Sequence, residues 1–222
     1  MQKFDTPAPI STVLDIPAGS VHIIAADQAD TTVEVLPADA SKNRDVKAAE
    51  ETRVGYTDGL LLIEAALPKS QLVGNTGAVE VTVRLPAGSR VEAKAASGNL
   101  RAVGRLGDVT FEGAQGTVEI DEATGAHLAL QAGDIAVGRL GSSAVISTRK
   151  GDIRIAEAMS GTLELRTEAG DVSVCAASGV SASLDAGTNY GRIHNSLRNT
   201  EGIAGLTIHA TTAYGDITAR SL

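Results

Sequence analysis

Residues 96–222 repeat a short pattern of apolar and polar positions that begins at a glycine. An aliphatic residue stands two places after each glycine, a variable residue follows, and a mostly apolar residue comes next. Alternation of this kind predicts a short strand with one buried face. The glycines, at intervals of 18, 17, 18, 19, 21 and 24 residues, are Gly98, Gly116, Gly133, Gly151, Gly170, Gly191 and Gly215. The aliphatic residues are Leu100, Val118, Ile135, Ile153, Val172, Ile193 and Ile217.

A second apolar segment occupies the middle of each repeat, between turn-rich stretches. Its members are Leu128/Leu130, Ala144/Ile146, Leu163/Leu165, Ala182/Leu184 and Leu206/Ile208. A strand this short cannot fold alone, because one coil buries too little apolar surface to offset the ordering of its backbone. Coils stacked about 4.8 Å apart would hydrogen-bond to each other and align their aliphatic side chains in internal rows.

The predicted fold is therefore all-β, a β-solenoid of about six coils. An antiparallel sandwich with regular hairpins also fits the spacing of the strands. The solenoid is favoured because the same class of residue recurs at the same place in every repeat, which a sandwich does not require.

The first 95 residues have a different, less regular pattern. Strand-like alternation appears at 11–16, 20–25, 31–36, 52–56, 60–65 and 79–85. Asp58-Gly59 predicts a tight hairpin, and the charged segment 41–51 fits either a short helix or a solvated loop. Pro17-Ala18-Gly19 returns 69 residues later as Pro86-Ala87-Gly88. We expect an antiparallel β cap region over residues 1–95 and the solenoid over 96–222, together as one continuous domain.

The composition supports thin β layers and excludes several classes of function. Of the 222 residues, 43% are hydrophobic, only 2% are aromatic and 24 are glycine, which suits regular strands with many tight turns. The net charge of −8 without a run of Lys or Arg argues against nucleic-acid partners and anionic membrane surfaces.

We expect no segment that directs the chain into or across a membrane. Its N-terminal residues contain no apolar run typical of a signal peptide, and no stretch approaches the length of a transmembrane helix. Cys175 is the one cysteine, so an internal disulfide is excluded, as suits a reducing compartment. These features predict a cytoplasmic protein without membrane insertion.

Several of these motifs resemble those of a known family. They are the opening Phe4-Asp5-Thr6-Pro7, the turns Ile16-Pro17-Ala18-Gly19 and Leu85-Pro86-Ala87-Gly88, and the serial Gly-Asp-(Ile/Val) segments. The chain resembles the bacterial β-strand-repeat proteins labelled "putative adhesin", a domain of unknown function, over nearly its whole length. The resemblance implies a β-repeat fold and a binding role, and it supplies no catalytic residues.

The clearest candidate site is a column of carboxylates directly after the repeat glycines. Asp134, Asp152 and Asp171 would stack on neighbouring coils. Aspartates at such positions commonly accept hydrogen bonds from backbone N–H groups of turns, which is the favoured interpretation. The alternative is a carboxylate ladder on the surface that binds cations. No other metal site and no cofactor are expected, because the four histidines are dispersed and Cys175 has no partner cysteine.

Two tyrosines, Tyr190 and Tyr214, each precede a repeat glycine and should stack at one corner. Corner packing is the favoured interpretation, and an aromatic contact patch for a partner is the alternative.

We therefore expect a non-enzymatic binding or scaffold module for a protein or glycan partner. A second hypothesis is self-assembly into a homo-oligomer through an open solenoid end, placed at the last coil, 215–222. A third is a polysaccharide-active enzyme, with Asp152/Arg154 or Glu164/Arg166 as the charged groups; cross-strand pairing is the usual role of such residues.

Overall fold

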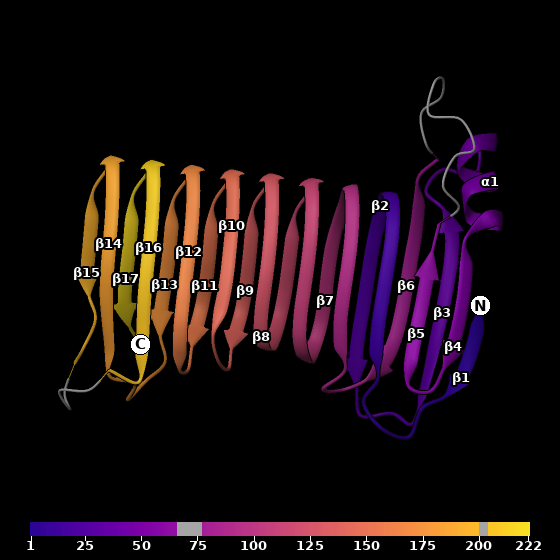
Figure 1. Cartoon of the computed structure of the whole chain (residues 1–222), viewed down its shortest axis with the longest axis horizontal. Coiled ribbons are helices and arrows are strands. Elements are labelled where there is room, and N and C mark those ends of the chain that lie inside the picture. Colours follow the sequence, from indigo (N-terminus) through magenta and orange to yellow (C-terminus); the bar gives the residue numbers. More distant parts are fainter. Residues whose placement is uncertain (66–76, 200–203) are drawn as a thin grey trace. The chain divides into compact units, whose positions relative to one another are not determined.

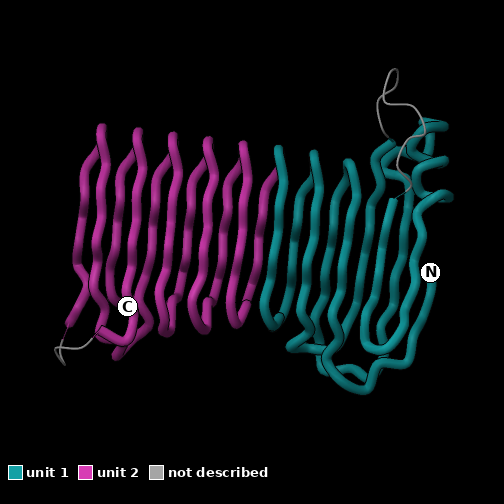
Figure 2. The backbone as a smooth tube through the Cα atoms, in the orientation of Figure 1, with its two compact units in different colours: residues 1–115 teal, residues 116–222 magenta. Residues whose placement is uncertain are grey.

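The apolar alternation forms strands through most of the computed structural model, which describes residues 1–65, 77–199 and 204–222. The chain divides into two compact units, residues 1–115 and 116–222 (Figure 2).

The second unit is built from two ladders of parallel strands, as expected of a β-solenoid (Figure 1). Its strands are β8 (Val118–Ala132), β9 (Ile135–Leu140), β10 (Ala144–Lys150), β11 (Ile153–Ala158), β12 (Gly161–Ala169), β13 (Val172–Ala176), β14 (Ala182–Tyr190), β15 (Ile193–Ser196), β16 (Leu206–Tyr214) and β17 (Ile217–Ser221). One ladder joins the start of β8 to β9, β11, β13, β17 and β15. The other joins the end of β8 to β10, β12, β16 and β14. The parallel pairing excludes the antiparallel sandwich for this unit.

The predicted aliphatic rows form the core of this unit. Ile153 pairs in register with Ile135 on one side and with Val172 on the other. These three side chains expose no more than 1% of their surface. The inward assignment made from the glycine spacing is therefore confirmed.

The expected order of the last two coils is wrong. The chain leaves β13 for the coil of β14 and β15, and then returns to place β16 and β17 between that coil and the preceding one. The segment 215–222, expected at an open end, thus lies inside the stack, with Ile217 and Ala219 each 1% exposed. The coil at the end is formed by β14 and β15 (Figure 1).

The first unit combines parallel and antiparallel strands. It contains β1 (Gln2–Asp5), β2 (Ser11–Ala26), β3 (Asp30–Pro37), α1 (Asn43–Glu51), β4 (Arg53–Thr57), β5 (Leu60–Glu64), β6 (Val79–Pro86) and β7 (Arg90–Gln115). The long strand β2 pairs in parallel with β5, β6 and β7. β3 then pairs antiparallel with β1 and β6, and β4 pairs antiparallel with β5.

These strands include the antiparallel β structure that was expected in the first 95 residues, alongside parallel pairs that were not. The β4–β5 hairpin turns through Asp58 and Gly59, both with positive φ (50° and 80°), as an Asp-Gly turn of this type requires. The charged segment is a helix, α1. Its buried Asp45 accepts a hydrogen bond from the Ala78 N–H at 3.0 Å, just before β6 begins. The segment of Gly98 also belongs to this unit, where β7 pairs with β2.

Candidate functional site

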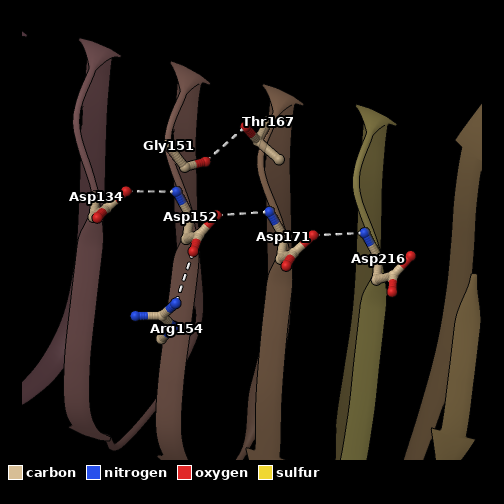
Figure 3. Close-up of polar contacts among 7 residues, drawn as sticks. All are labelled: Asp134, Gly151, Asp152, Arg154, Thr167, Asp171 and Asp216. Atoms are coloured by element: carbon tan, nitrogen blue, oxygen red, sulfur yellow. Dashed lines mark hydrogen bonds and ion pairs between the residues drawn. The ribbon is translucent and has the colours of Figure 1, made fainter. Parts of the chain in front are cut away.

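The aspartate column forms a continuous hydrogen-bonded ladder along one corner of the second unit (Figure 3). Oδ1 of Asp134 accepts the backbone N–H of Asp152 at 2.8 Å, and Oδ1 of Asp152 accepts that of Asp171 at 2.9 Å. Oδ1 of Asp171 accepts the N–H of Asp216 at 2.7 Å, and Asp216 accepts that of Arg192 at 2.8 Å. The expected role of these residues, accepting turn N–H groups, is confirmed.

The ladder follows the spatial order of the coils and not their order along the chain. Each carboxylate accepts a backbone N–H of the next coil. Arg192, whose side chain has no hydrogen-bond acceptor, occupies the last position. Asp152 also uses its second oxygen, Oδ2, which accepts a hydrogen bond from Nη2 of Arg154 at 2.7 Å. One carboxylate oxygen per coil is thus already committed to the backbone. Among the described residues, no group of three or more His, Cys, Asp or Glu side chains is arranged to hold a metal ion.

This geometry predicts that calcium does not stabilise the protein. A ligand stabilises a fold only by binding it more tightly than it binds the unfolded chain, and the described carboxylates form no cation site. Adding millimolar Ca²⁺ should therefore leave the melting temperature unchanged. The measurement is thermal unfolding followed by circular dichroism, with Mg²⁺ as the control. A rise with Ca²⁺ that EDTA reverses would instead support the cation-binding interpretation of Asp134, Asp152 and Asp171.

A second ladder, which we did not predict from the sequence, is made by threonines three places before the repeat glycines. These are Thr148, Thr167, Thr188 and Thr212. The Thr167 hydroxyl donates to the Gly151 carbonyl at 3.0 Å, and the Thr212 hydroxyl donates to that of Gly170 at 3.0 Å (Figure 3 shows the first). The hydroxyls of Thr148 and Thr188 likewise donate to a glycine carbonyl of the neighbouring coil, that of Gly133 and that of Gly215. The recurring Thr-x-x-Gly spacing was the signal that could have revealed these hydroxyls. Their hydrogen bonds join neighbouring coils at the corner.

The two tyrosines stack as predicted, but they do not pack into the corner. The ring centroids of Tyr190 and Tyr214 lie 5.1 Å apart with an interplanar angle of 3°. They come from the paired strands β14 and β16, so the distance follows from the spacing of the ladder. The residues nevertheless remain 68% and 61% exposed. Solvent-exposed aromatic rings held in a fixed geometry are typical of contact surfaces, so the structure favours the contact-patch interpretation.

The remaining candidate residues have local structural partners. Cys175 is buried and faces Arg220 on the paired strand, with Nε of Arg220 3.0 Å from Sγ. Nδ1 of His209 lies 3.4 Å from Oδ2 of Asp185, and Nε2 of His22 lies 3.9 Å from Oε1 of Glu80. The histidines come from separate strands, and no two of them are paired in the described registers.

The outward charges form cross-strand pairs of the kind expected on a solvated face. Nε of Arg139 lies 2.8 Å from Oε2 of Glu157 on the neighbouring coil, and this hydrogen bond lowers the pKa of the Glu157 carboxyl below its ordinary value. Arg154 is paired with Asp152. The other pair considered for a polysaccharide-active enzyme, Glu164 and Arg166, lies on β12. Glu164 is opposite His209 and Arg166 is opposite Thr211 in β16.

No helix in the described part of the chain has the length and apolar character needed to cross a membrane.

The chain is similar to a known family and to solved structures of bacterial proteins. A family model described as Toastrack DUF4097 matches residues 12–221. A "putative adhesin" from Bacteroides fragilis NCTC 9343 has a similar structure, with 14% identity and a TM-score of 0.59 over 98% of this chain and 95% of that one. A "putative cell adhesion protein" from Clostridium sporogenes ATCC 15579 is 15% identical over 100% of this chain and 98% of that one, with a TM-score of 0.37. No curated protein shows significant sequence similarity to this chain.

Proposed function

The chain belongs to the Toastrack DUF4097 family, and we propose that it is a non-enzymatic, adhesin-like binding domain whose partner is a protein or a glycan. The family is a domain of unknown function in bacterial proteins, and its structural neighbours carry adhesin names. A binding role is consistent with both. The residues that make contact have to be argued from the surface of this chain itself.

The observation that carries the proposal is the exposed tyrosine pair. Only five of the 222 residues are aromatic: Phe4, Tyr56, Phe111, Tyr190 and Tyr214. Phe111 is fully buried, and Phe4 packs against Tyr56 at 5.4 Å between centroids. The other two expose most of their surface on adjacent strands. Tyrosine is enriched at binding hot spots because it buries a large apolar area while its hydroxyl forms hydrogen bonds.

The ladder that carries the tyrosine pair suits a large partner. In the ladder of β10, β12 and β16, outward positions carry Ser147, Arg166 and Thr211 in one paired row. Rows of this kind repeat at the spacing of the coils, about 4.8 Å. A regular, stiff face of polar side chains can contact an extended partner at several points, which is how repeat scaffolds generally bind.

The test is capture of a partner and its loss when the tyrosines are removed. The purified protein is applied to a glycan array and used for pull-down from a native bacterial lysate. Tyr214→Ala should lower the apparent affinity for the captured partner about tenfold, the effect expected at a hot spot. Leu36→Ala, at another exposed apolar position (47%) in the first unit, serves as the control. Unchanged binding by a Tyr190→Ala/Tyr214→Ala double variant, or no partner in either assay, would contradict the proposal.

A further inference from the structure

The tyrosine pair belongs to a row of side chains in which the place next to the rings holds only a methyl group. The row follows one register position through the ladder and consists of Ala132, Lys150, Ala169, Tyr214 and Tyr190. Tyr190 covers one face of the Tyr214 ring, because parallel rings with centroids 5.1 Å apart overlap face to face. The other face of Tyr214 is turned toward the coil of Ala169. Tyr214 thus remains 61% exposed although it is stacked.

The place above Ala169 is wide enough for one more ring. The strands that carry Lys150 and Tyr214 lie two strand spacings apart, about 9.6 Å, with β12 between them. Lys150 is exposed and forms no ion pair within the described part of the chain. Since carbon atoms in contact lie about 3.5–4.0 Å apart, a six-membered ring that rests on Tyr214 fits above Ala169 and has Lys150 at its other side.

We propose that this place binds one pyranose ring of a neutral glycan chain, which packs its C–H face on Tyr214 and hydrogen-bonds to Lys150 and Asp171. The inference rests on the proposed function and narrows its partner to a glycan. Asp171 follows Ala169 by two residues, and its Oδ1 accepts the Asp216 N–H at 2.7 Å. This bond holds the carboxylate beside the coil of Tyr214 and leaves Oδ2 without a hydrogen-bond partner among the described residues.

The polar groups at this place favour a sugar over a side chain of a partner protein. Sugar hydroxyls both donate and accept hydrogen bonds, so one ring can use the Lys150 ammonium and the Asp171 carboxylate together. Lys and Asp are depleted at the cores of protein–protein interfaces, where aromatic hot spots are enclosed by contacts that exclude water. The open face of Tyr214 lies between one residue of each kind.

Charge favours a neutral glycan over an acidic one. The aspartate ladder runs along the same corner of the unit as the tyrosines (Figure 3), and the whole chain has a net charge of −8. Both repel a uronate or a phosphate group. Lys150 and Asp171 together add no net charge to the place itself.

The experiment measures the binding of neutral oligosaccharides to the full chain. Gluco-, manno- and galacto-oligosaccharides are screened on an array beside their uronate counterparts, and the tightest binder is titrated by calorimetry. Ala169→Tyr should lower the affinity at least tenfold, because a third ring fills the place while both tyrosines remain. Ala132→Tyr adds the same side chain at a half-buried position of the same row, on the other side of Lys150, and should bind like the wild type.

Two further measurements do not depend on how the protein accommodates a third ring. Lys150→Ala, at an exposed position, should weaken binding at least about fivefold, because one charged hydrogen-bond donor is lost. The chain has three tyrosines and no tryptophan, so a sugar on Tyr214 should change the near-ultraviolet absorbance of tyrosine. Tyr56→Phe should keep this change in full, and Tyr214→Ala should abolish it.

The outcomes separate this inference from the proposed function. No binding of neutral oligosaccharides, a preference for uronates, or equal affinities of the Ala169→Tyr and Ala132→Tyr proteins would overturn the glycan site. Circular dichroism verifies that the variants keep the fold of the wild type. A protein captured from the lysate through Tyr214 would overturn the glycan site alone, whereas a partner bound equally well without the two tyrosines would overturn both.

Discussion

Replacing Ile153 by Asp should unfold the second unit at room temperature. Ile153 is fully buried and lies between Ile135 and Val172 in the stacked ladder. A carboxylate at this position has no partner in the apolar row, and the expected cost of several kcal/mol is comparable with the whole stability of a small domain. Urea unfolding followed by circular dichroism measures the loss as a lower midpoint or as a missing transition.

The control is the next residue along the chain. The side chain of Arg154 points outward, is 66% exposed and forms an ion pair with Asp152. Exposed ion pairs contribute at most about 1 kcal/mol, so Arg154→Asp should change the midpoint only slightly. If the two variants lost stability equally, the alternation of inward and outward side chains along β11 would be wrong.

The interior rows and the aspartate ladder were predictable because both depend on spacing alone. A solenoid places residues of equal phase on top of each other, so the recurring glycine fixed which positions of β9, β11 and β13 would pair. The stacking of Tyr190 on Tyr214 followed for the same reason. The exposure of the two rings did not, because it depends on what surrounds the corner and not on the phase of the repeat.

The order of the last two coils was missed although the sequence contained a signal for it. The segment after Gly191 has Arg192 where four other repeats have Asp, and it has Asn195 at an otherwise mostly apolar inward position. Stacked in chain order, it would bury Asn195 between Val174 and Ala219 and would leave the Asp216 N–H without a carboxylate acceptor. At the end of the stack Asn195 is exposed, and its side chain accepts the Leu197 N–H at 3.0 Å.

The observed order thus satisfies both columns at once. Ala219 occupies the inner position and is 1% exposed. Every aspartate of the ladder from Asp134 to Asp216 accepts a backbone N–H of the next coil. An unsatisfied buried amide costs about 1–3 kcal/mol, which is enough to decide between two otherwise similar stacking orders. Repeats that break the pattern are therefore the ones to place at an end, wherever they fall in the chain.

Replacing Gly151 by Ala should be nearly as damaging as a buried charge, although it adds one methyl group. Gly151 has φ of 142°, and a Cβ at this position would clash with the carbonyl oxygen of Gly133 on the neighbouring coil. That atom belongs to backbone held in the ladder, so it cannot move aside without shifting the coil. Backbone strain and the forced separation together should lower the free energy of unfolding by about 3 kcal/mol or more.

A second glycine of the same unit separates this effect from the general cost of a side chain. A Cβ added at Gly187 in β14 would meet no heavy atom within 4 Å, and the φ of this residue is not positive. Gly187→Ala should therefore stay within about 1 kcal/mol of the wild type. Both variants are compared by urea unfolding under the same conditions. The corner depends on close backbone contact between coils. If the Gly151→Ala protein were as stable as the Gly187→Ala protein, neighbouring coils would have to lie further apart at this corner than the stacked glycines indicate.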